Sequence, residues 1–387
     1  MIPVNEPYIG ECELAYVTEC LRTGWISSTG RFIDEFEEKW SAYCGMSYGV
    51  AVSNGTTALQ TAVACLGFEP GFQVIMPTFT IISCALAVLY NGGVPVLVDC
   101  DPRTWCMDVN QVREKVEEDQ RQGYHNIKVI MPVHIYGHPV DMDPIIEIAE
   151  KYNLKIIEDA AEAHGAQYLT GRNRDNPAWK RCGGLGDISI FSFYANKIIT
   201  TGEGGMVLTN NVEYADKARR LRNLCFRPKQ RFFHTEMGYN FRLTNLQAAI
   251  GLAQMERIDV LLARKRWMGR AYTERLKGIK GLQLPVEEPW ARQVFWMYGL
   301  VLDENTDLNA IQFAQKLKEK GVETRPFFLG MHEQPVFQDR GLFRNEKYPV
   351  AEYIARQGLY LPSGLTLTEK QLDQACEAVR AILNEVK

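Results

Sequence analysis

The stretch GDISIFSFYANKIITTGEGGMVLTN, residues 186–210, places a lysine and a Thr/Gly-rich turn between two apolar runs. These runs, ISIFSF (188–193) and MVLTN (206–210), lack the regular alternation of a strand that has one face in water. Strands of that kind are buried on both faces and occur in largely parallel sheets covered by helices. We therefore predict that the stretch forms central strands of an α/β sheet, with Lys197 in the turn after the first strand.

The same pattern recurs toward the N-terminus. Further β-branched runs are QVIMP (73–77), VPVLVD (94–99), IKVIMPVHIYG (127–137) and KIIED (155–159). Segments with helical spacing lie among them, at TTALQTAVACLG (56–67) and MDPIIEIAEKYN (142–153). Strands alternating with helices at this spacing predict the α/β class, with a mixed, mostly parallel sheet that has helices on both faces.

The pattern changes near residue 245, where residues 245–278 have the spacing of one long helix. Beyond it lie a strand pattern and two helix patterns, at 295–303, 308–321 and 367–386. We expect a large domain over residues 1–250 and a smaller α+β domain over residues 251–387. The polar segment 170–184 contains Gly and Pro without periodicity and is expected to be a loop.

The overall composition excludes several classes of protein. The 387 residues are 46% hydrophobic, and the net charge of −4 gives no electrostatic basis for nucleic-acid binding. Ten cysteines are scattered without a CxxC pair, so we expect free, mostly buried thiols in a reducing cytoplasm and no metal site. The N-terminus lacks the form of a signal peptide, and the longest apolar stretch is too interrupted to span a membrane.

Lys197 follows a predicted strand at the place where ligands bind in open α/β sheets, beyond the carboxyl end. A lysine there forms a Schiff base when its surroundings destabilise the ammonium. Taken alone, a surface lysine on a turn is the more common explanation. Asp159 strengthens the catalytic interpretation, because a carboxylate beside the ring nitrogen of pyridoxal phosphate keeps that nitrogen protonated. An aspartate at this position is explained equally well as a helix N-cap.

A third motif, SNGTTAL (53–59), predicts a helix start with two threonines in its first turn. Backbone N–H groups at a helix N-terminus form a phosphate cradle together with such hydroxyls, and Ser192 could add another hydroxyl. An ordinary capped helix is the more common meaning of a motif this short. Together, however, the motifs supply a phosphate site, a ring-nitrogen acid and an imine lysine, each beside a predicted strand.

This combination resembles the fold-type I pyridoxal-phosphate enzymes. The chain is similar to the sugar aminotransferases of the DegT/DnrJ/EryC1 family, and most similar to the branch that forms perosamine. The motifs that carry the resemblance include WISSTGRFIDEFE, SNGTTALQ, MPTFT, PVHIYGHPVDMD, IIEDAAEAHGA, GDISIFSFYANKIITTGEGGMV, GYNFRLTNLQAAIGLAQMERID, FWMY and ETRPFF. It runs from about Pro7 to near the C-terminus and covers nearly the whole chain.

The resemblance implies a role for each matching residue. Lys197 matches the lysine that holds the cofactor as a Schiff base and moves the proton between the cofactor and substrate carbons. Asp159 matches the acid at the pyridine nitrogen. Glu162 matches the residue that contacts the 3-hydroxyl of the ring, where many members carry glutamine. The matches to the phosphate contacts are Gly55, Thr56 and Ser192.

Three further positions bear on assembly and specificity. Asn240 matches an asparagine that reaches the cofactor phosphate of the neighbouring subunit, which implies a homodimer with shared active sites. Ile81 replaces the family's usual aromatic residue, so it would pack on the cofactor ring without aromatic stacking. Leu329 lies in RPFFLGMH (325–332), where perosamine-type sequences tend to read RPVFHPMH.

Contacts with the substrate are predicted for four residues, namely Trp25, His134, Arg325 and His332. Large aromatic residues such as Trp25, Phe295 and Trp296 could stack on a base or sugar, although they more often belong to a core. Arg325 could bind a diphosphate or form an ordinary ion pair. His164 is expected to be a packed helix histidine.

The resemblance implies transfer of an amino group from L-glutamate to a nucleotide-linked keto-sugar, of the GDP-4-keto-6-deoxymannose type, by a cytoplasmic enzyme. The product would serve surface polysaccharide, lipopolysaccharide or O-antigen biosynthesis. A UDP- or dTDP-linked keto-hexose or an octulosonate stays open as the substrate.

A sugar dehydratase of the same fold carries histidine in place of lysine, so Lys197 argues against it. A nicotinamide-dependent dehydrogenase is disfavoured because no GxGxxG motif follows a predicted strand.

Overall fold

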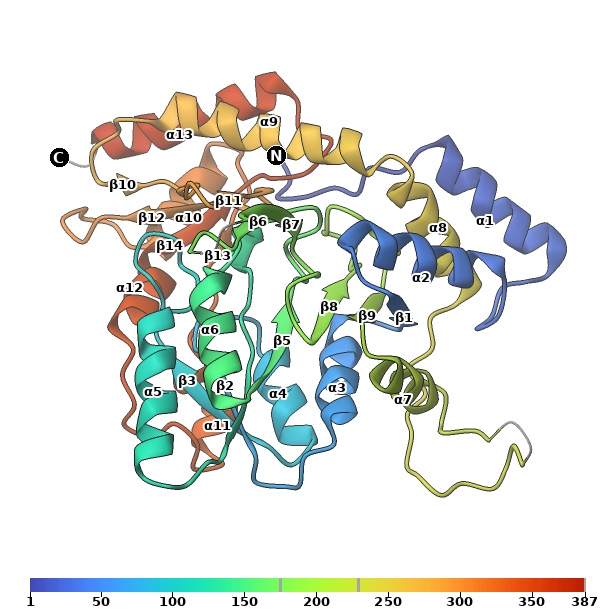
Figure 1. The fold of residues 1–387 in the computed structure, drawn as a ribbon. Coiled ribbons are helices and arrows are strands. Elements are labelled where there is room, and N and C mark those ends of the chain that lie inside the picture. Colours follow the sequence, from blue (N-terminus) through green and yellow to red (C-terminus); the bar gives the residue numbers. More distant parts are fainter. Residues whose placement is uncertain (174–175, 228–229, 386–387) are drawn as a thin grey trace.

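A seven-stranded sheet forms the centre of the protein in the computed structural model, which describes residues 1–173, 176–227 and 230–385 (Figure 1). The strand order is β1-β9-β8-β5-β4-β2-β3. The strands are β1 (Tyr48–Val52), β2 (Gln73–Pro77), β3 (Val94–Val98), β4 (Ile127–Ile130), β5 (Lys155–Asp159), β8 (Ile188–Ser192) and β9 (Gly205–Thr209). β9 is antiparallel to both of its neighbours, whereas β3, β2, β4, β5 and β8 pair in parallel. The predicted mixed, mostly parallel sheet is confirmed.

The apolar runs form these strands because both faces of the sheet are covered. Every residue of β9 is buried, as are four of the five residues of β5. The run predicted over 127–137 is a strand only as far as Ile130. Pro132 has no N–H for a ladder, and Tyr136 adopts a left-handed conformation with φ of 51°. The chain therefore leaves the sheet at this point and turns.

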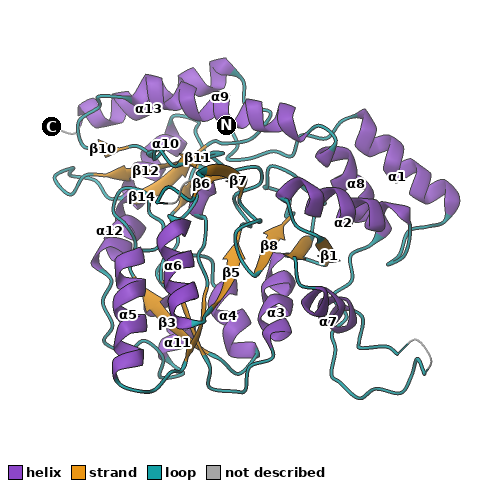
Figure 2. Ribbon diagram, in the orientation of Figure 1, coloured by secondary structure: helices purple, strands orange, loops and turns teal. Residues whose placement is uncertain are grey.

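Helices surround the sheet (Figure 2). They are α1 (Glu11–Thr23), α2 (Arg31–Cys44), α3 (Gly55–Leu66), α4 (Ser83–Tyr90), α5 (Val109–Arg121), α6 (Met142–Tyr152) and α7 (Val212–Arg222). α3 packs on α4 and α7, α5 packs on α6, and α1 and α2 pack against α8 (Asn245–Met255). The predicted helices at 56–67 and 142–153 correspond to α3 and α6.

The single long helix predicted over 245–278 is wrong. It is divided into α8 and α9 (Ile258–Leu276) at Arg257, whose φ of −119° and ψ of 20° are not helical. The Arg257 guanidinium donates to the Tyr8 carbonyl and to Glu13, which lie at the N-terminal end of the chain. These contacts come from residues more than 200 positions away, so local helical spacing could not reveal the break.

A second, smaller hydrophobic core lies beside α9 and contains a four-stranded antiparallel sheet of order β10-β12-β14-β13. The sheet and this core are formed by β10 (Leu282–Gln283), β12 (Tyr298–Leu302), β13 (Arg325–Pro326), β14 (Gly358–Leu361), α10 (Ala310–Glu319) and α13 (Glu369–Glu385), together with α9. α11 (Pro335–Gln338) and α12 (Pro349–Gln357) lie in the same part of the chain but bury Phe337, Ala351 and Ile354 in the larger core. Ile2 also belongs to the smaller core and bridges to Val322. The domain boundary at residue 250 stays a prediction.

The segment 170–184 differs from the expected loop, although residues 174 and 175 lie outside the described residues. It contains β7 (Ala178–Arg181), which pairs with β6 (Gln167–Thr170), and β6 in turn pairs with β11 (Ala291–Arg292). The strand was missed because its polar side chains show no apolar period. They are held instead by stacking, with the Arg292 guanidinium 4.0 Å from the Trp179 ring and the Arg181 guanidinium 3.9 Å from the Tyr43 ring.

Two further features bear on the environment of the protein. Every cysteine except Cys12 is buried, and all are free thiols. Among the described residues, the helices are too short or too polar to cross a membrane.

Candidate active site

Predicted site residues gather at the carboxyl edge of the central sheet. Asp159 is the last residue of β5, Ser192 is the last residue of β8, and Lys197 follows in the turn before β9. The start of α3 lies against this edge, because a Cβ added to Gly55 would come within 2.7 Å of the Ser192 Cβ. Three segments that are separate in the sequence therefore meet where the parallel strands end.

The N-terminus of α3 is built as the motif SNGTTAL predicts. The Asn54 side chain caps the helix by accepting a hydrogen bond from Thr57 N at 2.9 Å. The first intrahelical bond runs from Ala58 N to the Asn54 carbonyl, so the N–H groups of Gly55 and Thr56 precede it. The Thr56 hydroxyl lies 2.8 Å from that of Ser83. This end of α3 presents N–H groups and hydroxyls beside Ser192, which is the donor set that a phosphate needs.

Asp159 is 2% exposed and receives two hydrogen bonds. Ala161 N donates to Oδ1 at 3.0 Å, and the Cys84 thiol donates to Oδ2 at 3.3 Å. Burial raises the pKa of Asp159 above its ordinary value, and these two hydrogen bonds oppose the rise. The thiol contact was not expected from the sequence, because Cys84 lies 75 residues before Asp159.

Lys197 and Glu162 form a buried pair, with Nζ 3.7 Å from Oε1 and side chains that are 9% and 8% exposed. Burial lowers the pKa of Lys197, while the carboxylates of Glu162 and Asp159 oppose that shift. Burial raises the pKa of Glu162. Tyr136 N donates to Oε2 of Glu162 at 2.7 Å and fixes the orientation of the carboxylate. The pair thus combines a lysine that gives up its proton readily with an acid that holds one.

Trp296 also contacts Lys197, with Nζ 3.6 Å from the centroid of its ring. This tryptophan is 4% exposed and belongs to the core, as one of the two interpretations of the sequence held. Its proximity to Lys197 could not be predicted, since 99 residues separate them. No local sequence pattern indicates that an aromatic residue so far along the chain contacts the lysine.

His134 belongs to a buried network and not to an open pocket. Val140 N donates to His134 Nδ1 at 2.9 Å, so Nε2 carries the hydrogen that it donates to Glu158 at 2.9 Å. The ring is fully buried and both nitrogens are used. Glu158, His134 and Cys182 come close enough to suggest a metal site. However, the Glu158 oxygens also accept from Ser189 Oγ and from the backbone N–H groups of 183, 185 and 186, which makes the cluster a structural anchor.

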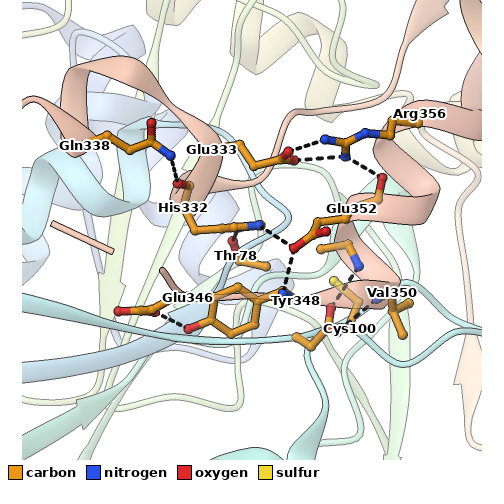
Figure 3. A network of polar contacts seen from close by, with 12 residues as sticks. Thr78, Cys100, His332, Glu333, Gln338, Glu346, Tyr348, Val350, Glu352 and Arg356 are labelled. Atoms are coloured by element: carbon orange, nitrogen blue, oxygen red, sulfur yellow. Dashed lines mark hydrogen bonds and ion pairs between the residues drawn. The ribbon is translucent and has the colours of Figure 1, made fainter. Parts of the chain in front are cut away.

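His332 and Thr78 connect the C-terminal region to the loop after β2 (Figure 3). The Thr78 hydroxyl lies 2.8 Å from His332 Nδ1, and Glu352 Oε1 lies 3.2 Å from Nε2. Val350 N and the N–H of the next residue donate to Asp99 at 3.0 and 2.8 Å, which caps α12 at the end of β3. With both ring nitrogens engaged, His332 ties the C-terminal region to the end of β2.

The remaining predicted residues are accessible. Ile81 is 42% exposed and Trp25 is 56% exposed, and the Trp25 carbonyl accepts from Asn245 Nδ2 at 2.8 Å. Arg325 pairs with Glu323 at 2.6 Å. Asn240 is exposed, and its Oδ1 accepts from Arg242 Nε at 2.9 Å. None of these side chains has a direct polar contact with Lys197 or Asp159 among the described residues.

His164 is fully buried among aromatic rings, 5.2 Å from Phe191 and 5.5 Å from Phe193 by ring centroid. Burial lowers the pKa of His164 to about 3, so the ring is neutral. It packs as the sequence predicted, although in a turn and not in a regular helix.

Comparison with known proteins agrees with this geometry. The model of the DegT/DnrJ/EryC1/StrS aminotransferase family matches residues 7–380. GDP-perosamine synthase of Caulobacter vibrioides is 42% identical over 383 residues, which cover 99% of this chain and 98% of that protein. The dTDP-3-amino-3,4,6-trideoxy-alpha-D-glucose transaminase of Streptomyces venezuelae is 33% identical over 91% of this chain and 87% of that protein.

A solved structure shows the same fold. The X-ray structure of S. venezuelae DesV in complex with a ketimine intermediate superposes with a TM-score of 0.86, at 31% identity, and covers 97% of this chain and 95% of that one. The chain therefore belongs to the DegT/DnrJ/EryC1/StrS aminotransferase family and is a pyridoxal-phosphate-dependent sugar aminotransferase of fold type I.

Proposed function

We propose that this enzyme transfers an amino group from L-glutamate to a nucleotide-linked keto-sugar, with GDP-4-keto-6-deoxymannose the best candidate. The observation that carries the proposal is Lys197, which is buried at the sheet edge where Asp159 and the N-terminus of α3 also lie. Burial lowers the pKa of this lysine. The choice of a GDP-linked sugar is supported by 42% identity to a GDP-perosamine synthase, against 33% to a dTDP-sugar transaminase. The latter keeps a dTDP-linked keto-sugar as the second candidate.

The residues at the sheet edge fit pyridoxal phosphate. The N–H groups of Gly55 and Thr56 and the hydroxyls of Thr56 and Ser192 would hold its phosphate. Asp159 would face the ring nitrogen, Glu162 would face the 3-hydroxyl, and Ile81 would pack on the ring. Burial of the carboxylate of Asp159 makes it a strong acceptor for the proton on the ring nitrogen. When bound, the cofactor serves as an electron sink for the carbon that loses its proton.

Lys197 is the proposed acid and base. Its lowered pKa makes the neutral amine more available than that of an exposed lysine, which suits proton transfer. Nζ would accept the proton from the carbon of glutamate and return it to the carbon of the cofactor, and would do the reverse with the sugar. Glu162 keeps Nζ close, because its carboxylate is fixed by Tyr136 N. Proximity of this kind is a large part of the rate enhancement that enzymes achieve.

We also propose a homodimer in which Asn240 reaches the phosphate of the partner's cofactor. Residues 223–227 and 230–244, the described parts of the chain between α7 and α8, include a stretch that extends away from the sheet (Figure 1), and Asn240 follows near the start of α8. The stretch exposes the apolar side chains of Phe232 and Met237, which are 83% and 94% accessible. Exposed apolar groups of this size favour a protein partner.

The free thiols are compatible with a cytoplasmic enzyme, and the product would serve surface polysaccharides such as a lipopolysaccharide O-antigen.

The test uses protein loaded with pyridoxamine phosphate and a panel of keto-sugars. GDP-, dTDP- and UDP-linked 4-keto-6-deoxyhexoses and an octulosonate are offered at equal concentration. Return of the visible absorbance of the aldehyde form reports amino transfer. We expect the GDP-linked sugar to react fastest. A faster reaction with the dTDP-linked sugar would replace the proposed nucleotide, and failure of every nucleotide sugar would overturn the substrate class.

A further inference from the structure

Lys197 contacts both a carboxylate and an aromatic face. Oε1 of Glu162 lies 3.7 Å from Nζ, and the centroid of the Trp296 ring lies 3.6 Å from Nζ. A buried ammonium loses its hydration, and the cost is large unless other groups replace the water. The face of a tryptophan attracts a cation through its quadrupole and offers more attraction than the other aromatic side chains.

Trp296 is held rigidly in this position. Its Nε1–H donates to the Asn196 carbonyl at 2.8 Å, one residue before Lys197. Its own carbonyl accepts from Lys265 Nζ at 2.7 Å. Its ring stacks on Tyr136 at 6.2 Å with an interplanar angle of 24°. The indole therefore has no freedom to follow Lys197, and it marks a fixed location for the ammonium.

Residues of the smaller core and of α9 hold Trp296 in place. Lys265 lies in α9, is 1% exposed, and donates to the carbonyls of Trp296 and Ser363. Phe295 has a left-handed φ of 49°, which turns the chain so that its ring faces the smaller core while Trp296 faces the larger one. A buried lysine without a carboxylate partner and a left-handed phenylalanine are both unfavourable by themselves. Together they aim the tryptophan at Lys197.

We propose that Trp296 is a positioning residue for Lys197, and that its ring face holds Nζ whenever the lysine is protonated and not bonded to the cofactor. The inference rests on the proposed function, in that Lys197 is taken as the cofactor lysine. The ring keeps the protonated amine between Glu162 and the reacting carbons and prevents it from swinging away. The amine is thus in place when the next proton transfer requires it.

The charged and titratable groups that face Lys197 determine the sign of the effect. Glu162 and Asp159 attract the ammonium through their charge, and His164 is neutral. The Trp296 ring attracts only the protonated amine. Removing the quadrupole while the site stays buried should therefore lower the pKa of Lys197 further.

The test is the rate at which cofactor-free protein takes up pyridoxal phosphate, measured by stopped-flow absorbance between pH 6 and 10. Uptake requires the neutral amine, so the midpoint of the pH profile follows the pKa of Lys197. Trp296→Leu should move the midpoint down by about 0.5–1.5 pH units, the equivalent of a cation–π contact. Trp296→Phe should move it less, because the phenyl ring keeps part of the attraction.

A matched control is Trp267→Leu, since Trp267 lies under the Arg264 guanidinium at 4.0 Å on α9 and takes no part in the site. Its midpoint should equal that of the wild type. Because Trp296→Leu could disturb folding, a second series replaces Trp296 site-specifically with mono-, di- and trifluorinated tryptophan. These analogues weaken the quadrupole at nearly constant size, so the midpoint should fall stepwise with each fluorine.

A midpoint that stays unchanged through the fluorinated series, or that rises in it, would overturn the inference. The proposed function fails by a different result. In that case wild-type protein takes up no pyridoxal phosphate, or Lys197→Ala takes it up with the wild-type pH profile.

Discussion

Glu158 and Glu162 are two buried glutamates four residues apart, and they differ in the hydrogen bonds that they accept and in their charged neighbour. The Glu158 oxygens accept five hydrogen bonds, from His134, Ser189 and three backbone N–H groups. Glu162 accepts one from Tyr136 N and otherwise faces Lys197 at 3.7 Å. Burial alone would raise the pKa of both. For Glu158 the hydrogen bonds outweigh burial and hold the pKa below its ordinary value, whereas the pKa of Glu162 is raised.

This difference distinguishes a carboxylate with a structural role from one that takes part in proton transfer. A carboxylate with every lone pair occupied stays ionised and ties together the segments that donate to it. One with few donors and a lysine beside it changes its protonation state when the lysine does. Burial and residue type are the same in the two cases, so the number of hydrogen-bond donors and the neighbouring lysine distinguish them.

The largest expected effect comes from removing the lysine that makes Glu162 different. Lys197→Ala should lower turnover with glutamate and keto-sugar by more than about 10³-fold, because no other group is placed to move the proton. Thermal unfolding should stay close to that of the wild type. Near-normal transamination in the variant would show that the Lys197–Glu162 pair is structural, like its neighbour.

The next largest effect is a difference in unfolding free energy between variants of the two glutamates. Glu158→Gln should cost about 3–5 kcal/mol of unfolding free energy, because an amide turns an N–H toward backbone donors in a buried site. Glu162→Gln should cost less than about 1 kcal/mol, since the amide oxygen still accepts from Tyr136 N. Urea unfolding of both variants measures the difference. Equal costs would show that the two carboxylates contribute to stability in the same way.

The pH dependence of stability should have opposite signs at the two positions. The pKa of Glu162 is raised to about 7 in the folded protein, from 4.5. Between these values the folded state binds more protons than the unfolded chain, so stability should fall as pH rises through the window, by about 1–3 kcal/mol. The contribution of Glu158 is present above pH 4.5 and should be lost as pH falls below it.

Urea unfolding of cofactor-free wild type and Glu162→Gln between pH 4 and 8 isolates the first contribution. The wild type should lose stability relative to the variant as pH rises toward 7, and the difference should be flat above that pH. A difference that is constant across the whole range would mean that Glu162 stays ionised when folded.

The smallest effect concerns Asp159, a third buried carboxylate with an intermediate number of donors. Cys84→Ala removes the thiol that donates to Oδ2, so the pKa of Asp159 should rise further. We expect turnover to fall about 2–5-fold, as for the loss of one weak hydrogen bond. Cys84→Ser should restore it. Steady-state kinetics of the two variants decide the point, and equal losses would show that the contact is only packing.

Local patterns located much of the fold. β2 begins and ends as predicted, at Gln73 and Pro77, because an uninterrupted apolar run leaves one reasonable placement. β7 is not predicted because its side chains are mostly polar, and β1 is not predicted although YGVAV is apolar, because the run is only five residues long and contains a glycine. The break at Arg257 was missed because its cause, the contact with Tyr8, comes from the other end of the chain. Patterns within a segment cannot report on such a contact.

The sequence by itself determined the class of the fold, the family, and the strand-end placement of Asp159, Ser192 and Lys197, because each follows from a short motif. Only the tertiary structure decided which of two neighbouring glutamates is an anchor and which faces the lysine, and that Trp296 contacts the lysine. The physical reason is that a side chain's protonation depends on donors and rings brought to it by distant segments. Those partners become neighbours only when the chain folds.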